Sequence, residues 1–395
     1  MQQEHSNYHL HMKKRINMHR SNSTNALYNN SHSGSGTEII FCNPVSPEYV
    51  LKKYCLHLSE EDREEIKNYK EIYYIHNNSN TKCWMTEDDF IFYNFNKDNH
   101  IAFRYQQLQF LGRGSFGTVI KCYDHKLKMN VAIKVLTESD DDGFLINREI
   151  NFLKILNKQE AKYNSSSILE LIDTFRQHGF TFIVTKYYEE NLYEYYTSQS
   201  FSHNLSLYDI KRIAKSVAQA LYVCHQSGII HSDLKPENVV LNGNEVRLID
   251  FGCASFNGET VYQTVQSLYY RAPEVIFQMG FGSSIDVWSF GCLLFEMVTG
   301  QPLFLVRNEG ELIPQIKRIL GDPSYELIQQ SNKMRRYWFR KQLIRDTTGS
   351  LKRSFIGSFV GNSNKEIIDL ISSCLTWDPR ERPSMREILN SPFFN

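Results

Sequence analysis

Hydrophobic and polar positions follow two different periods in the first half of the chain. Apolar and β-branched residues crowd four short runs that are typical of β-strands: residues 107–111, 119–123, 131–135 and 180–185. Helical spacing predicts one helix among them, at residues 144–157, with a partly apolar face made by Ile146, Ile150, Leu153 and Ile155. This pattern predicts a small α+β lobe with a five-stranded antiparallel sheet and one main helix.

After residue 192 the pattern becomes mostly helical. Apolar residues at helical spacing predict a set of helices: residues 207–226, 284–298, 312–320, 365–375 and 385–389. A short strand pair is expected between them, at residues 239–241 and 246–249. The fold class is therefore α+β with two lobes, a small lobe at residues 105–188 and a large, mainly helical lobe at residues 189–395.

The chain before residue 105 divides into two parts. Residues 1–37 are rich in Asn, Ser and His and hold few aliphatic residues, so this tail is expected to be disordered. Order is expected from about Asn43, in an accessory segment at residues 43–104. Ser46 before Pro47 predicts a capped helix start, and Ser59 with Asp62 predicts a second one that continues to about residue 67. The aromatic segment at residues 69–74 is expected to be extended.

Composition limits the class of protein. Lys plus Arg and Asp plus Glu each total 44, which argues against a main role in coating nucleic acid or an anionic membrane. The eight cysteines form no C-x-x-C pair and no signal peptide is present, which indicates a reduced compartment. No stretch is long and apolar enough to span a bilayer. The expectation is a monomeric, cytoplasmic protein, with nuclear access left open by the basic cluster Lys13, Lys14 and Arg15.

Two motifs in the small lobe suit phosphate chemistry. The stretch LGRGSFGTV at residues 111–119 lies between two predicted strands and does not open a helix, as a dinucleotide-binding loop would. Glycine allows backbone N–H groups to approach phosphate oxygens without an intervening Cβ. The stretch VAIK at residues 131–134 follows at a spacing that suits Lys134 for gripping phosphates. Glu149 on the following helix is the best candidate for its partner, and residues 140–142 are better explained as surface acids.

Three motifs in the large lobe complete the set. The stretch HSDLKPEN at residues 231–238 offers a carboxylate, a cation and an amide within one short loop. The stretch DFG at residues 250–252 follows a predicted strand. The stretch APE at residues 272–274 ends the segment that DFG begins. The order and spacing of all five motifs resemble the motif set of eukaryotic protein kinases.

The kinase resemblance implies a site for ATP and Mg²⁺. Asp233 is then the catalytic base, Lys235 offsets charge on the transferred group, and Asn238 and Asp250 bind metal. Glu274 pairs with Arg382, a buried ion pair, and Asp286 has a structural role. The implied ATP-binding residues are Leu111, Gly112, Gly114, Ser115, Phe116, Gly117, Val119, Ala132, Lys134, Glu149, Thr185, Tyr187 and Tyr188.

Further stretches narrow the resemblance to the dual-specificity tyrosine-regulated kinases, class 2, within the CMGC group. The activation segment YQTVQSLYYRAPE at residues 262–274 is similar to theirs, and Ser232 before Asp233 matches the family's small residue there. Residues 98–105 resemble the family's homology box, and residues 322–362 resemble the CMGC insert. The basic stretch at residues 333–341 is then a docking site for acidic partners or, on the simpler interpretation, a solvated face. The resemblance implies protein substrates with Ser or Thr acceptors, often proline-directed, with arginine upstream.

Two departures from the family change what is expected. Thr264 stands where the family has an autophosphorylated tyrosine, and Leu268 replaces an arginine that helps to hold the phosphate, while Arg271 remains. Three arrangements stay open: phospho-Thr264, phospho-Tyr262, or a loop held by Leu268 without phosphate. At the hinge, Thr185 replaces a bulky phenylalanine gatekeeper, which predicts an open back pocket, and Lys186 replaces an acid.

Two rival interpretations remain. One is a kinase-fold scaffold with weak or no catalysis, although every catalytic position is filled. The other is a different CMGC kinase, such as a homeodomain-interacting or pre-mRNA-processing kinase. The accessory segment at residues 69–74 favours the class 2 tyrosine-regulated family.

Overall fold

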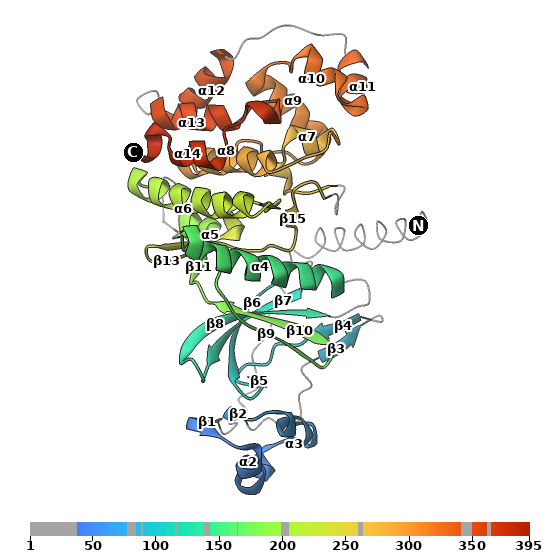
Figure 1. Ribbon diagram of the computed structural model, residues 1–395, viewed down its shortest axis with the longest axis vertical. Helices are drawn as coiled ribbons and strands as arrows, with labels where there is room; N and C mark the ends of the chain where they lie inside the picture. Colours follow the sequence, from blue (N-terminus) through green and yellow to red (C-terminus); the bar gives the residue numbers. More distant parts are fainter. Residues whose placement is uncertain are drawn as a thin grey trace. The chain divides into compact units, whose positions relative to one another are not determined.

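The computed structural model describes residues 38–76, 84–87, 90–114, 117–137, 143–163, 165–198, 205–259, 264–340, 350–361 and 365–395. These residues form two compact units (Figure 1). The first unit ends at Gly143 and resumes at Ile172–Tyr187, and the second holds Phe144–Leu171 and Tyr188–Asn395. The tail predicted to be disordered, residues 1–37, lies outside the described residues. The helix predicted at residues 144–157 was assigned to the small lobe, residues 105–188, but it lies in the second unit.

The first unit contains a sheet with the order β5-β6-β7-β8-β10-β9. It therefore has six strands, and the predicted number of five was wrong. The extra strand, β5, has only two residues, too few to show a hydrophobic alternation. The strands are β5 (His100–Ile101), β6 (Tyr105–Gly114), β7 (Gly117–Asp124), β8 (Met129–Thr137), β9 (Leu171–Gln177) and β10 (Phe180–Lys186).

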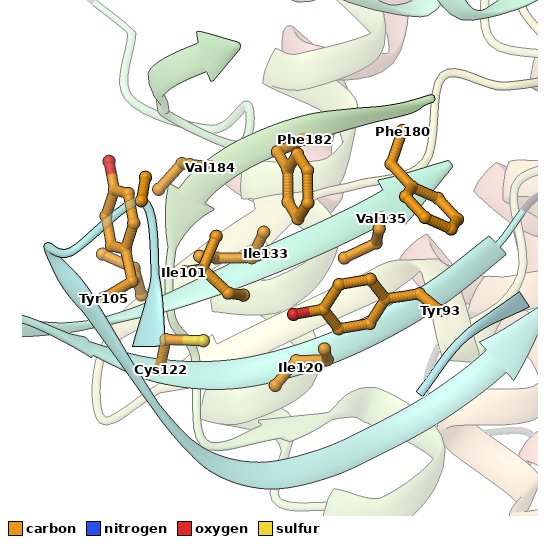
Figure 2. Packing of buried hydrophobic residues seen from close by; sticks show 12 residues of the cluster. Tyr93, Ile101, Tyr105, Ile120, Cys122, Ile133, Val135, Phe180, Phe182 and Val184 are labelled. Carbon is orange, nitrogen blue, oxygen red and sulfur yellow. The ribbon is translucent and has the colours of Figure 1, made fainter. Parts of the chain in front are cut away.

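The two faces of this sheet differ because side chains alternate along each strand. In β7 buried and half-buried residues alternate without exception. The buried face carries a core cluster whose side chains pack against one another in Figure 2: Tyr93, Ile101, Tyr105, Ile120, Cys122, Ile133, Val135, Phe180, Phe182 and Val184. The opposite face carries motif residues, among them Ala132, Lys134 and Thr185.

The accessory segment folds around its own small core. Ser46 caps α2, and Ser59 forms a capping box with Asp62 at the start of α3, as predicted. The described residues include β1, which starts before the predicted Asn43 because Ile39 and Ile40 pair with β2. The elements are β1 (Glu38–Val45), α2 (Pro47–Tyr54), α3 (Glu60–Glu65), β2 (Ile72–His76), β3 (Trp84–Glu87) and β4 (Phe90–Tyr93).

The homology box joins this segment to the sheet. Phe103 is fully buried in the accessory core, and its carbonyl accepts hydrogen bonds from the N–H groups of Tyr73 and Tyr74, both at 3.0 Å. The His100 ring stacks on Phe103 with 4.0 Å between ring centroids, and its Nε2 lies 3.3 Å from Asp62 Oδ1. Ala102 and Phe103 have positive φ angles of 53° and 50°, so the chain makes a tight turn that inserts the Phe103 ring.

The second unit is mainly helical. The predicted helices at residues 207–226 and 385–389 are α6 and α14, and the predicted strand pair is β13 and β14. Its helices are α4 (Gly143–Tyr163), α5 (Leu192–Ser198), α6 (Leu207–Gln226), α7 (Pro273–Ile276), α8 (Ser284–Thr299), α9 (Glu309–Leu320), α10 (Tyr325–Gln329), α11 (Asn332–Arg340), α12 (Ser350–Val360), α13 (Lys365–Cys374) and α14 (Met385–Leu389). Its strands are β11 (Glu190–Asn191), β12 (Ile229–Ile230), β13 (Val239–Asn242), β14 (Glu245–Leu248) and β15 (Ser255–Phe256).

Helix α8 forms the centre of this unit, since nearly all of its side chains are buried. Among the described residues no helix combines the length and apolarity that a membrane crossing requires. Every cysteine in the described ranges is a free thiol.

Candidate active site

The motif residues of the first unit share one face of the sheet. Lys134 lies opposite Val119 in β7 and Ile183 in β10, and Ala132 lies opposite Thr185. Directly opposite residues project to the same side, and residues two apart do so as well. Val119, Ala132, Lys134 and Thr185 therefore belong to the face turned away from the core cluster.

The described residues of the glycine motif lie at the end of β6 and the start of β7, where Gly114 is opposite Gly117. Gly117 has φ +144°, and a Cβ there would lie 2.2 Å from the Val135 carbonyl oxygen, so only glycine fits. A Cβ on Gly112 would meet nothing within 4 Å. Packing within the protein therefore does not require glycine at that position. Two predicted ATP-binding residues of this motif, Ser115 and Phe116, lie outside the described residues.

The end of β10 carries the predicted gatekeeper and hinge. Thr185 is 7% exposed, and its Oγ1 donates a hydrogen bond of 3.2 Å to the Ala132 carbonyl. Lys121, which lies opposite Ala132 in β7, places its Nζ 4.1 Å from the centroid of the Tyr187 ring. The division into units falls between Tyr187 and Tyr188. Tyr188 is buried in the second unit, and burial raises its pKa to about 12.

The second unit places the predicted base in a network of donors. Asp233 Oδ1 accepts hydrogen bonds from the backbone N–H and the hydroxyl of Ser267, at 3.0 and 2.8 Å. Asp233 Oδ2 lies 2.7 Å from Lys235 Nζ and 3.3 Å from Asn238 Nδ2. Burial alone would lower the pKa of Lys235, but nearby acids, Asp233 first, outweigh it and raise that pKa. The cation is therefore retained beside the carboxylate.

A buried carboxylate supports the loop that carries Asp233. Asp286 is fully buried and accepts the backbone N–H groups of His231 and Ser232, each at 2.9 Å, and the His225 ring at 2.9 Å. Burial would raise the pKa of Asp286, but the contacts with His225 and the loop lower it. The His231 ring also reaches the Ile249 carbonyl at 2.9 Å. This network fixes the loop and the strand end before Asp250.

Asn238 and Asp250, the two predicted metal ligands, each have a side-chain oxygen of the kind that a hard divalent cation prefers. The Ile249 N–H donates to the Asn238 carbonyl at 2.9 Å, which brings the two predicted ligands into neighbouring segments. Asn238 Nδ2 donates to the Asp233 carbonyl at 2.8 Å, so its amide oxygen points the other way and is available as a ligand. Within the described residues no group of three or more His, Cys or carboxylate side chains could hold a metal. Two oxygen ligands completed by substrate phosphates are the usual Mg²⁺ arrangement.

The activation segment is tied to the helical core. Gln266 has φ +67°, and its side-chain amide donates to the Ile285 carbonyl and the Ser289 hydroxyl, at 2.9 and 2.8 Å. Arg271 donates to the Val265 and Gln266 carbonyls and forms an ion pair of 2.6 Å with Glu309. Arg271 therefore already has an anionic partner. Thr264 is exposed, and Tyr262 lies outside the described residues.

Two buried carboxylates anchor the end of this segment. The predicted ion pair is present: Glu274 accepts two hydrogen bonds from Arg382, at 2.6 and 2.8 Å, with both side chains buried. Glu296 accepts the hydroxyls of Tyr196 and Tyr270, each at 2.6 Å. Burial raises the pKa of Glu296. Arg382, which also donates to the Ser284 carbonyl, and Glu296, through Tyr270, hold the end of the activation segment against α8.

The structure thus distributes the predicted site residues over both units. The first unit holds those of the sheet: Leu111, Gly112, Gly114, Gly117, Val119, Ala132, Lys134, Thr185 and Tyr187. The second unit holds Glu149, which is buried on α4, together with Tyr188 and the loop and activation-segment residues. Within the second unit Asp233, Lys235 and Asn238 are in contact, and Asp250 follows Ile249. Sequence reasoning missed Ser267, His231 and Glu309, although the first two stand inside the motifs.

The fold and the site define a protein kinase domain, and the family model for the protein kinase domain matches residues 105–394. The chain is 30% identical over 387 residues to the dual specificity tyrosine-phosphorylation-regulated kinase 3 of Rattus norvegicus, covering 89% of this chain and 66% of that protein. The Macaca fascicularis kinase of the same name is also 30% identical over 387 residues, with 89% and 68% covered. For kinase 2 of Drosophila melanogaster the identity is 33% over 383 residues, with 91% and 52% covered.

The chain belongs to the dual specificity tyrosine-phosphorylation-regulated kinase family. It spans about two thirds of the length of the rat and macaque relatives and about half of the fly relative. Membership of the protein kinase family carries a general requirement for ATP and a divalent metal ion.

Proposed function

We propose that this chain is an active protein kinase that uses Mg²⁺ and transfers the γ-phosphoryl group of ATP to Ser or Thr of protein substrates. The observation that carries this proposal is the Asp233 carboxylate, held by Ser267 and Lys235 beside Asn238. A scaffold has no need of a carboxylate with this set of donors. The proposal therefore favours catalysis over the scaffold interpretation.

Each residue has a defined part in the transfer. Asp233 orients the substrate hydroxyl and accepts its proton, while Lys235 offsets negative charge on the group in transit. Lys134 grips the phosphates from the sheet side. Such enzymes act mainly by positioning and by electrostatic stabilisation of a loose transition state.

The proposed metal is Mg²⁺, which would neutralise charge on the phosphate oxygens when bound. Asp250 would contribute a carboxylate oxygen and Asn238 its amide oxygen. Because both ligands are oxygen atoms and neither belongs to a complete protein cage, the metal would bind together with ATP.

A test of the activity needs only the purified full chain, labelled ATP and a generic basic protein. We expect phosphate transfer with Mg²⁺, none with excess chelator, and recovery when Mg²⁺ is restored. Ca²⁺ should not replace Mg²⁺, because its larger coordination sphere positions the phosphates differently. Absence of transfer with Mg²⁺ to several basic proteins would instead support the scaffold.

We also propose that the substrate residue after the acceptor is proline or another apolar residue. Arg271 occupies the carbonyls of Val265 and Gln266, which therefore cannot readily accept an N–H from a bound peptide. Proline has no N–H to satisfy, so it is not penalised there. The partly exposed Leu268 adds an apolar surface.

Matched peptides that differ only after the acceptor serine test this specificity. We expect kcat/KM to be highest for Pro, lower for Leu, and lowest for Ala and Lys. Equal rates for Pro and Lys would contradict the assignment.

A further inference from the structure

The first half of the activation segment is joined to α4 by an ion pair. Glu259 follows β15, and its Oε2 lies 2.7 Å from an Arg148 guanidinium nitrogen. The same oxygen accepts the Phe256 N–H at 3.2 Å, and the Glu259 N–H donates to the Phe256 carbonyl at 3.0 Å. The carboxylate is therefore held in place by its own turn before it meets Arg148. The contact lowers the pKa of Glu259.

An aromatic contact reinforces this connection. The Arg148 guanidinium lies over the rings of Phe144 and Phe152, at 5.4 and 5.2 Å from their centroids. The Phe152 ring packs edge-on against Phe256, with 5.1 Å between centroids. Strand β15 is itself fixed, because Phe256 pairs with Ile229 in β12. Helix α4 and the segment from Phe256 to Glu259 are thus linked by an ion pair and by aromatic packing.

The position of Arg148 makes this connection relevant to catalysis. Arg148 directly precedes Glu149, the buried carboxylate that is predicted to pair with Lys134. Adjacent residues on a helix are separated by 100° of rotation, so fixing Arg148 also fixes the direction of Glu149. In protein kinases this Lys–Glu pair must be in place, and activation-loop phosphorylation commonly controls it.

A second ion pair holds the other half of the segment. Glu309 stands in the first turn of α9, and its carboxylate lies 2.6 Å from Arg271. Arg271 in turn holds the Val265 and Gln266 carbonyls. In the sequence, Thr264 therefore falls between Glu259 and Arg271, each of which belongs to one arginine–carboxylate pair. Leu268, five residues after Gln263, brings no charge to a phosphate on this stretch.

We propose that Glu259 and Glu309 supply the negative charges that hold the activation segment, so that the kinase is active without phosphate on Tyr262 or Thr264. Each carboxylate forms with arginine the charge-assisted contact that a phosphate forms in a phosphorylated loop. Arg148 and Glu259 are positioning residues, since they act through α4 on Glu149. This inference rests on the proposed kinase function.

The first test compares phosphorylated and unphosphorylated forms of the full chain. The protein is expressed together with a broad-specificity phosphatase, and intact mass is used to verify that no phosphate remains. We expect initial rates on a basic protein within about twofold of protein expressed without phosphatase, and no lag in the progress curve. A lag that shortens as enzyme concentration rises, or a loss of more than about twentyfold, would overturn the proposal. Inactivity of both preparations would instead contradict the kinase function itself.

The second test removes the ion pair on α4. Glu259→Gln and Arg148→Gln should each lower kcat about three- to tenfold, while Tm stays within about 2 °C. Glu259→Asp should recover part of the loss, and so should the exchanged pair Arg148→Glu with Glu259→Arg. The matched control is Asp369→Asn, which removes the exposed pair of Asp369 with Arg353 at 2.8 Å. Unchanged kcat in both single variants, or a loss as large in the control, would refute the positioning role.

Discussion

At the scale of single residues, the site depends on a carboxylate whose two oxygens have different partners. Asp233 Oδ1 is held by Ser267 and Oδ2 by Lys235, so its orientation is fixed before a substrate hydroxyl arrives. Preorganised groups of this kind need no rearrangement during the reaction. The residue to test is therefore Asp233.

Asp233→Asn should keep the shape of this network but lose the proton acceptor. We expect kcat to fall by about 10²–10⁴-fold, the usual contribution of a positioned base. ATP affinity should change little, because Asp233 is not a predicted nucleotide ligand. Steady-state kinetics and direct binding of ATP measure both quantities. Turnover comparable with that of the unmodified chain would disprove the role of Asp233.

Thr185 provides a second prediction at this scale. Its side chain is small and bonded to the Ala132 carbonyl, so space beyond it is expected to admit bulky inhibitors. Thr185→Phe should weaken a kinase inhibitor with a bulky back-pocket substituent more than tenfold and change the KM for ATP less than threefold. Overpacking should cost about 1–3 kcal/mol of stability. The same inhibitor without the substituent is the control. Equal affinity of the bulky compound for both proteins would show that Thr185 is not the gatekeeper.

The residues that sequence reasoning found and missed differ in a physical way. The pairing of Glu274 with Arg382 was predicted because the resemblance to protein kinases implies it. Glu309, by contrast, lies on a helix well after the segment it holds, and nothing in its local sequence shows which arginine it meets. Arg148 and Glu259 are equally distant in sequence. Ion pairs between distant segments need the fold before they can be recognised.

At the scale of elements, segments with a clear cap or a clear apolar pattern were predicted well, and segments without one were not. The helices α6 and α14 begin and end where their patterns indicated, because each has a serine cap and an apolar face. The strands β5 and β9 were missed. The first has two residues, and the second is half-buried along most of its length, so it shows no alternation. Their place in the sheet is set by tertiary pairing and not by local sequence.

The contact between α3 and the homology box leads to a prediction about pH. Burial would raise the pKa of Asp62, but His100 and the Ser59 cap outweigh it and lower that pKa to about 2. Because the folded-state pKa is depressed, the stabilisation is present above the unfolded pKa, 3.8, and is lost as pH falls through about 2. The contribution at pH 6 is about 2 kcal/mol.

Asp62→Asn should therefore lower the free energy of unfolding by about 2 kcal/mol at pH 6, and by about half as much at pH 3. Urea unfolding at a series of pH values measures this difference. The control is Glu64→Gln in the same helix, whose pair with Lys67 is exposed and should contribute less than about 1 kcal/mol at any pH. If the loss of unfolding free energy caused by Asp62→Asn were the same at pH 3 as at pH 6, the ionised Asp62 carboxylate would not be the source of the stabilisation.

At the scale of the whole molecule, the described residues form two compact units, and the predicted site residues are divided between them. The sheet face with Lys134 belongs to the first, and the loop with Asp233 and Asp250 belongs to the second. The sequence placed Lys134 and Asp233 in different predicted lobes, but it also placed Glu149 in the small lobe, whereas Glu149 belongs to the second unit. If both residue assignments hold, full binding of Mg·ATP requires Lys134 and also Asp250.

Thermal unfolding with saturating Mg·ATP tests this requirement. A ligand at 100 times its Kd adds about 2.7 kcal/mol, enough to raise Tm by several degrees. Lys134→Met in the first unit and Asp250→Asn in the second should each remove more than half of this shift, because each deletes a contact with the phosphates or their metal. Adenosine, which has no phosphates, should give the same smaller shift in all three proteins. Lys333→Met on α11 is the matched charge-removal control and should keep the full Mg·ATP shift. If Asp250→Asn also kept the full Mg·ATP shift, the assignment of Asp250 as a metal ligand would be wrong.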